Sequence, residues 1–220
     1  MKIRLLATPL VAVSLAACAG TRTSEPASPR TDESLEALEA LYRARMDSAT
    51  MSVHEADVRF MTGMVAHHAQ ALVMSHMAPD NGASTEIRVL TGRIINAQRD
   101  EISVMQTWLR DRGLPAPEVD EMGHVSMGGD HSMHMQGMLT PEQLDELRAA
   151  RGPEFDRLFL TYMIQHHNGA VSMVHELFAT DGAAQDDLVF KLASDIQVDQ
   201  TTEVARMERM LDALQRGPTR

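Results

Sequence analysis

Apolar residues recur every three or four positions along most of the chain, which is the spacing of one face of an α-helix. No stretch of useful length alternates between apolar and polar residues as an exposed strand does. The pattern therefore predicts an all-α protein. Glycine and proline interrupt it at Pro79-Asp80-Asn81-Gly82 and at Asp181-Gly182. We expect helices at about 32–50, 55–77, 85–112, 140–150, 154–179 and 185–214.

Four of these helices are long, and they form two pairs, each joined by a short turn. Each long helix has one apolar stripe, and two such hairpins can bury their stripes against each other. We therefore expect a four-helix bundle with short accessory helices. The accessory helix near residue 140 begins with Thr140-Pro141-Glu142-Gln143, which combines a capping box with proline in the first turn.

The first 18 residues predict an export signal that is not part of the fold. Lys2 and Arg4 precede an apolar run ending in Leu15-Ala16-Ala17-Cys18, the pattern at which a bacterial lipoprotein is cut and acylated. A membrane-spanning anchor is the alternative, but it needs about 20 apolar residues and this run is shorter. We expect an exported protein, held by a lipid on Cys18 to the bacterial cell envelope on its periplasmic or outer face. Residues 19–31, rich in Ser, Thr, Pro and Ala, predict a flexible tether.

The most faithful repeat in the chain is a histidine pair flanked by methionines. It occurs twice at a constant spacing of 99 residues, and Asp57 is repeated in the same register as Asp156. The chain therefore divides into a first helical repeat (32–112), a linker (113–139) and a second helical repeat (140–216). The repeated positions are Met64, His67, His68 and Met74 in the first copy, and Met163, His166, His167 and Met173 in the second.

These histidines fall on the core-facing stripes of their helices, and Gln98, Glu101, Gln200 and Glu203 share one face of the partner helices. Polar groups on such a stripe must be satisfied by one another, by water or by a metal ion. One interpretation is a buried hydrogen-bond network that fixes the helix register. The other is a metal site with His and Met ligands, in which the glutamates orient the imidazoles. The two interpretations are compatible.

The linker has a composition of its own, with five glycines, five methionines and three histidines. A solvated loop has no packing reason to hold so many methionines. The linker therefore predicts either a hydrophobic patch on the bundle surface or a loop that binds soft metal ions. Its candidate ligands are His124, Met127, His131, Met133, His134 and Met135.

The ligand types favour copper. Thioether sulfur prefers Cu(I), imidazole suits Cu(I), Cu(II) or zinc, and carboxylate prefers harder ions. Cys18 is the only cysteine, and lipidation would consume its thiol, so methionine is the soft ligand that remains. The net charge of −11 attracts cations, and without a basic cluster nucleic acid is not an expected partner. We expect copper as Cu(I) or Cu(II), with zinc second.

Two motifs of the first repeat resemble the domain of unknown function 305 family. They are Asp57-x-x-Phe60-x-x-x-Met64-x-x-His67-His68 and Gln98-x-x-Glu101-x-x-x-Met105-x-x-Trp108. The second copy carries the His-His motif but has Glu208 to Leu211 where the first has its tryptophan. The resemblance implies a ferritin-like helical bundle in an exported bacterial protein, and some members of that family bind copper in the periplasm.

These observations predict an envelope protein that sequesters copper or passes it to another copper-handling protein of the envelope. A dinuclear metal oxidoreductase of the ferritin type is an alternative. It would need Glu-x-x-His on two helices, and the chain offers Glu121-x-x-His124 only beside glycines in the linker. The third class is an interaction module that binds no metal and docks a partner through its acidic surface or its methionines.

Overall fold

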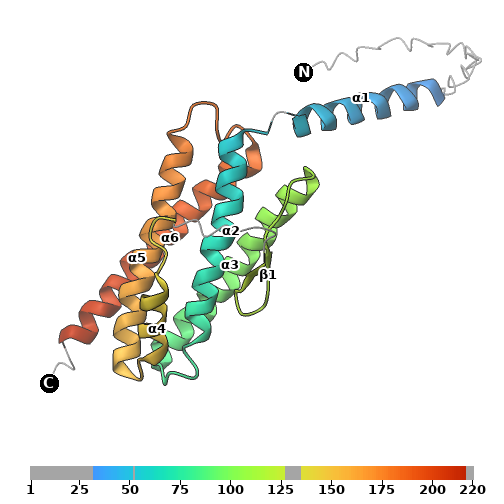
Figure 1. The fold of residues 1–220 in the computed structure, drawn as a ribbon. Helices are drawn as coiled ribbons and strands as arrows, with labels where there is room; N and C mark the ends of the chain where they lie inside the picture. The colour runs from blue at the N-terminus through green and yellow to red at the C-terminus, as the bar shows by residue number, and fades with distance from the viewer. Residues whose placement is uncertain (1–31, 52, 127–134, 217–220) are drawn as a thin grey trace, which may run out of the picture. The chain divides into compact units, whose positions relative to one another are not determined.

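The computed structural model describes residues 32–51, 53–126 and 135–216 (Figure 1). The predicted leader, its Cys18 and the tether lie outside these described residues. The same is true of four candidate ligands in the linker, Met127, His131, Met133 and His134.

The described residues form six α-helices and one short two-stranded ladder, so the predicted all-α fold is confirmed. The six helices lie where the sequence predicts them. None of those described combines the length and apolarity needed to cross a membrane. The elements are α1 (Asp32–Met51), α2 (Glu55–His76), α3 (Thr85–Asp111), β1 (Glu118–Val119), β2 (Val125–Ser126), α4 (Pro141–Ala149), α5 (Pro153–Phe178) and α6 (Asp187–Arg216).

Local signals set the helix starts. The His54 side chain accepts the backbone N–H of Ala56 at the start of α2, and Ser84 caps α3 through the N–H of Ile87. The capping box predicted at Thr140 is present at the start of α4, with both of its reciprocal hydrogen bonds to Gln143. Because each cap satisfies backbone N–H groups that the helix itself leaves free, these residues fix where the helices begin.

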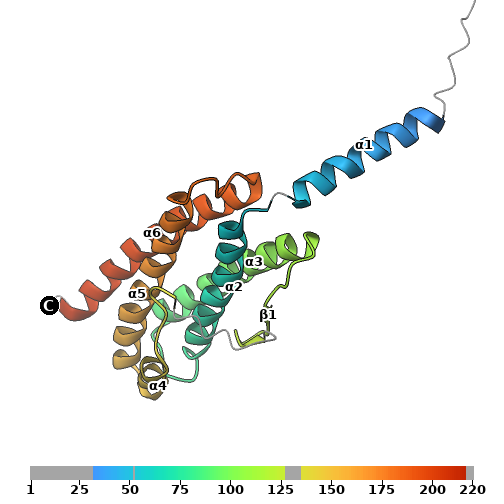
Figure 2. The ribbon, with the colours of Figure 1, turned by 45° about the horizontal axis from the view of Figure 1, so that its top comes forward.

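Helices α2 and α3 form one hairpin, and α5 and α6 form the other (Figures 1 and 2). The hairpins meet mainly through α2 and α5, which carry the two histidine pairs. The accessory helix α4 packs against α5. The predicted bundle of two duplicated hairpins is therefore confirmed.

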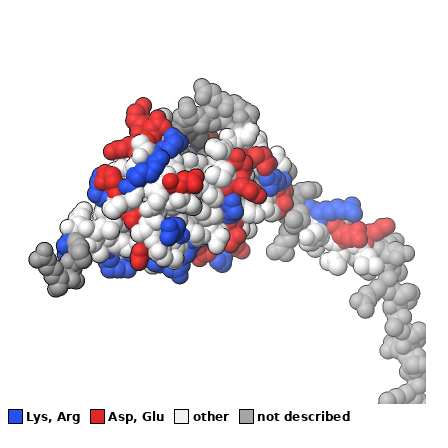
Figure 3. All heavy atoms as spheres, turned by 90° about the horizontal axis from the view of Figure 1, so that it is seen from below, with Lys and Arg blue, Asp and Glu red and all other residues white. Residues whose placement is uncertain are grey.

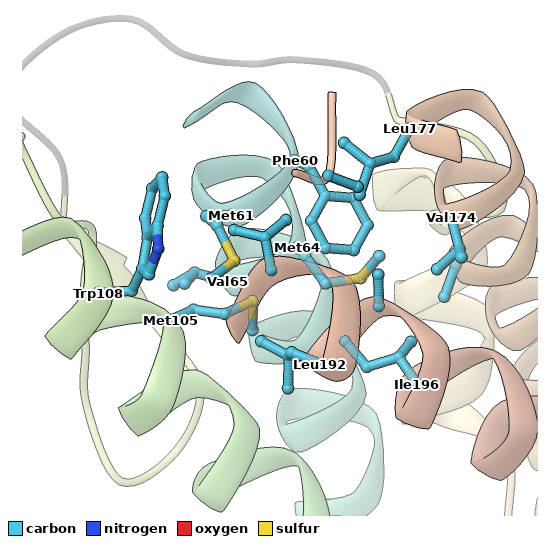
Figure 4. Packing of buried hydrophobic residues seen from close by; sticks show 14 of the residues in the cluster. Phe60, Met61, Met64, Val65, Met105, Trp108, Val174, Leu177, Leu192 and Ile196 are labelled. Atoms are coloured by element: carbon cyan, nitrogen blue, oxygen red, sulfur yellow. The ribbon is translucent and has the colours of Figure 1, made fainter. Parts of the chain in front are cut away.

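The interior of the bundle contains two separate apolar cores, one at each end. Each core draws on half of every bundle helix, and Figure 4 shows the sulfur atoms of Met61, Met64 and Met105 inside the first. The first core includes Phe60, Met64, Val65, Met105, Trp108, Val174, Leu177 and Ile196. The second includes Met74, Ile87, Leu90, Ile94, Phe155, Phe159, Met163 and Met207. On α5 the histidine pair falls between the segments that build these two cores, and on α2 it does so with the exception of Leu72, which belongs to the first core.

Two buried aspartates tie each hairpin to the turn of the other. Asp57 of α2 accepts the backbone N–H of Ala184, 2.7 Å away, in the turn that precedes α6. Asp156 of α5 accepts the N–H of Ser84, 3.2 Å away, at the start of α3. The repeated register of these aspartates is therefore visible as a reciprocal pair of contacts.

Replacing Asp57 with alanine should destabilise the bundle by about 1–3 kcal/mol, because the buried N–H of Ala184 would lose its acceptor. Urea unfolding followed by circular dichroism measures the loss. Asp181→Ala, in the exposed part of the same turn, is the matched control and should stay close to the parent protein. Equal stability of the two variants would show that the contact contributes nothing.

The linker begins with a ladder that the sequence does not predict. Strands β1 and β2 pair antiparallel, with Glu118 opposite Ser126 and Val119 opposite Val125. Two residues per strand are too few to show an alternating pattern. Gly123 closes this turn with φ at 90°, and a Cβ there would lie 2.3 Å from the carbonyl oxygen of Ala69 on α2. Glycine therefore allows the linker to lie directly on α2.

Helix α1 has an apolar face that is open to solvent. Its apolar residues Leu35, Leu38, Leu41 and Tyr42 are all more than half exposed. On the face of the molecule in Figure 3, Lys and Arg side chains are interspersed among Asp and Glu.

Candidate metal centre

The four paired histidines are completely buried. The rings of His67 on α2 and His166 on α5 are in contact, with centroids 3.9 Å apart and planes inclined by 42°. The ring of His167 lies 6.1 Å from that of His166. The duplication therefore brings its two histidine pairs together across the interface of the hairpins, as one histidine layer that consists of His67, His68, His166 and His167.

Every histidine of this layer uses its Nε2 atom to bind an oxygen. His68 and His167 donate to the carboxylates of Glu101 and Glu203, each at 2.7 Å. His67 donates to the backbone carbonyl of Gln136 at 3.1 Å, and His166 donates to the carbonyl of His67 at 3.0 Å. Because these oxygens act as acceptors, the proton of each neutral ring resides on Nε2.

This tautomer leaves a free lone pair on Nδ1 of all four rings. The four Nδ1 atoms are buried and have no hydrogen-bond partner among the described protein atoms. The same holds for both polar side-chain atoms of Gln98 and for Oε1 of Gln200. Buried polar atoms without partners are uncommon in folded proteins and call for a ligand, a water molecule or an ion. A bare imidazole nitrogen is the form in which histidine binds a metal.

Burial keeps three of these rings neutral, those of His67, His166 and His167. It lowers the pKa of His67 from 6.5 to about 3, with the nearby His68 as a second cause. Burial likewise lowers the pKa of His166 well below its ordinary value, and His67 adds to the effect. The pKa of His167 is also lowered by burial, which outweighs its hydrogen bond to Glu203. No proton therefore competes with a metal ion for the Nδ1 atoms of these three rings near neutral pH.

The predicted methionine ligands have different surroundings. Met64 and Met163 lie one helical turn before the histidines and are fully buried. Met74 is also fully buried, within the second apolar core. Its repeat partner Met173 is only partly buried and lies beside Met135 of the linker. Sequence identity between the repeats thus does not give the two methionines the same environment.

His124 is not part of the histidine layer. Its side chain is 71% exposed and pairs with Asp120 at 2.9 Å. The neighbouring Glu121, which completes the Glu-x-x-His pattern, is exposed as well. In the described part of the chain, no three His, Cys, Asp or Glu side chains surround one point as metal ligands, and this includes the histidine layer. A metal ion bound there would use fewer of these side chains or would require the rings to turn.

The end of the linker is fixed against the layer by residues that sequence reasoning missed. The Gln70 amide binds both backbone groups of Leu139, donating to its carbonyl and accepting its N–H. A Cβ at Gly169 of α5 would lie 2.0 Å from the carbonyl oxygen of Gln136, the group that binds His67. A glycine inside a helical stripe is the one sequence signal that indicates such a close approach.

The fold and this layer define a class of protein, a bundle of two repeated helical hairpins with histidines buried where the repeats meet. The chain belongs to the family described as "Domain of unknown function (DUF305)", which matches residues 57–211. The resemblance stated from the sequence motifs is thereby confirmed. No curated protein matches the chain.

Solved structures of relatives have the same fold. A DUF305 protein of Streptomyces coelicolor, described as secreted, is 26% identical, with a TM-score of 0.61 over 71% of this chain and 92% of its own. A DUF305 fragment from Deinococcus radiodurans is 29% identical, with a TM-score of 0.61 over 73% of this chain and 97% of its own.

CopM is a further relative. In its Cu(I)-bound form it is 28% identical, with a TM-score of 0.53 over 71% of this chain and 95% of its own. CopM has also been solved in Cu(II)-bound, silver-bound and apo forms. A copper-binding protein is thus among the structural relatives of this chain.

Proposed function

We propose that this protein binds copper in its histidine layer. The observation that carries the proposal is the set of four buried Nδ1 atoms, each with a free lone pair and no hydrogen-bond partner among the described residues. Buried nitrogens of this kind are costly unless something binds them. The copper-bound structures of CopM support copper as the ion.

The surroundings of the layer favour the monovalent ion. Neutral imidazole accepts either oxidation state, whereas buried thioether sulfur, available from Met64 and Met163, prefers Cu(I). Glu101 accepts the Nε2–H of His68, and Glu203 accepts that of His167. These hydrogen bonds would hold the Nδ1 atoms of both rings in a fixed direction. Cu(II) is the second candidate and zinc the third.

The proposed setting is the cell envelope. The leader and Cys18 predict export and lipid anchoring, and a DUF305 relative is described as secreted. An anchored protein that holds copper would either sequester it or transfer it to another envelope protein. Both roles need the same buried ligands.

The direct test is metal analysis of the leaderless protein after anaerobic loading with Cu(I) against a competing chelator. A variant with His67, His68, His166 and His167 all replaced by leucine should lose tight copper, because no Nδ1 remains in the layer. Leucine fills a volume similar to that of imidazole, and circular dichroism reports whether the bundle is retained.

His124→Leu is the matched control, because this histidine is exposed and outside the layer. It should bind copper like the parent. Tight copper retained by the folded four-leucine variant would exclude the histidine layer as the site. Tight copper lost from His124→Leu alone would move the site to the linker.

A further inference from the structure

A pocket opens beside the histidine layer, between α2, α5 and the end of the linker. It has a volume of about 420 Å³, and its walls include Phe60, Gly63, Met135, Met173 and Glu176. Both methionines are partly exposed, so solvent reaches the pocket. It therefore differs from the closed interior that holds Met64, Met74 and Met163.

The two thioether groups meet at Gly63. A Cβ built on this glycine would lie 3.2 Å from Sδ of Met135 and 3.5 Å from Cε of Met173. One point on α2 is thus within van der Waals reach of both side chains. With no side chain of its own, Gly63 leaves the space between them open.

The corresponding position of the second repeat is occupied by a large side chain. The residue that corresponds to Gly63 in the repeat register is Tyr162, whose hydroxyl donates to Glu146 of α4. Helix α4 packs on α5 at this position. Duplication alone would have produced two equal surfaces, so the methionine pocket is a feature of the first repeat together with the linker.

The pocket is adjacent to the histidine layer. Gln136 lines it and uses its carbonyl oxygen to accept the N–H of His67, 3.1 Å away. Gly63 lies one helical turn before His67 on the same helix. Met135 therefore directly precedes, in the sequence, the residue whose carbonyl contacts the histidine layer.

We propose that Met135 and Met173 form a solvent-facing port that first takes up a monovalent soft cation, Cu(I), and passes it to the histidine layer. This inference rests on the proposed function. It adds the path by which copper enters the protein and a selectivity for Cu(I). Thioethers bind Cu(I) and Ag(I) but bind Cu(II) and Zn(II) poorly, so the port selects the oxidation state. Among the described residues, the lining carries one exposed carboxylate, Glu176, and one exposed guanidinium, Arg59, which pairs with Glu55 at 2.7 Å, so the pocket has no unpaired positive charge there to repel a cation.

The transfer is a ligand exchange without a redox change. Bonds from copper to the Met135 and Met173 sulfurs break as bonds to imidazole nitrogens form, and the ion remains Cu(I) throughout. Two thioethers hold the ion weakly enough to release it to the stronger nitrogen ligands. The rate of loading, and not the final amount of copper, is therefore the quantity that depends on the port.

The test compares the parent with a Met135→Leu/Met173→Leu double variant, which removes both sulfurs and nearly preserves side-chain volume. Copper is supplied as a Cu(I)–chelator complex, and its uptake is followed by stopped-flow absorbance. We expect loading to slow by about tenfold with unchanged final stoichiometry. Met210→Leu, at a partly buried methionine in another pocket, should load like the parent. An unchanged rate in the double variant would overturn the port.

Methyl NMR with Ag(I) as the probe separates failure of the port from failure of the histidine layer. Substoichiometric Ag(I) should shift the methyl signals of Met135 and Met173, and Zn(II) should not. These shifts should persist in the four-leucine variant of the histidine layer. Their absence contradicts the port, whereas tight copper retained in that variant contradicts the proposed function and leaves the port standing.

Discussion

Acidification from about pH 7.5 to about pH 5 should destabilise the metal-free protein, by about 1.4 kcal/mol per pH unit below pH 6.5 from His67 alone, and His166 and His167 should add to this loss. Burial lowers the pKa values of His67, His166 and His167 in the folded state, whereas the unfolded chain takes up protons at the ordinary value of 6.5. Below that value the unfolded state binds more protons, so stability falls as the pH falls. For His67 the loss continues to about pH 3, its folded pKa.

Urea unfolding at several pH values measures this dependence. Data above about pH 5 isolate the histidines, because most carboxyl groups titrate below that range. A variant with leucine at His67, His166 and His167 should lose most of the slope. A parent protein with equal stability at both ends of the range would show that the buried rings accept protons as readily as exposed ones.

Removal of the carboxylates that bind His68 and His167 should weaken copper binding strongly. Glu101→Ala and Glu203→Ala should each reduce the affinity for Cu(I) by about 10–100-fold, the usual effect of losing the group that orients a ligating histidine. Each carboxylate accepts the Nε2–H of its histidine at 2.7 Å. Without it, the ring can rotate or place its proton on Nδ1, the atom that must be bare. Competition titrations against a Cu(I) chelator give the affinities.

Glutamine at the same positions is the informative comparison. Its side-chain oxygen still accepts the hydrogen bond but lacks the negative charge, so Glu101→Gln should lose less affinity than Glu101→Ala. Glu118→Gln, on the exposed ladder, should change nothing. Parent-like affinity in both alanine variants would mean that the imidazoles are held by packing alone.

The sequence predicts the layer itself but not its chemistry in detail. The constant spacing of the two histidine pairs and the apolar stripes around them are enough to place four imidazoles in one interior. The identity of the free nitrogen cannot be deduced in this way. For His67 it depends on the carbonyl of Gln136, a backbone group 69 residues away that carries no side-chain signal.

The methionines show the same limit. Met74 and Met173 occupy equivalent positions in the repeat, yet one is fully buried and the other lines an open pocket. The difference comes from Gly63 in one repeat and Tyr162 in the other, and from the linker that brings Met135 to the first. A pattern of apolar positions predicts which face is buried, but long-range packing decides which part of that face stays open.

The reciprocal aspartate contacts have a consequence for the origin of the chain. Each hairpin supplies the carboxylate that the turn of the other requires, so the surface between them is self-complementary. A self-complementary surface of this kind is what joins two identical subunits about a two-fold axis. A single ancestral hairpin with both features could thus have paired with its own copy before gene fusion joined them. After fusion the two halves no longer need identical sequences. Gly63 and Tyr162, which occupy corresponding positions in the two repeats, are an example of such divergence.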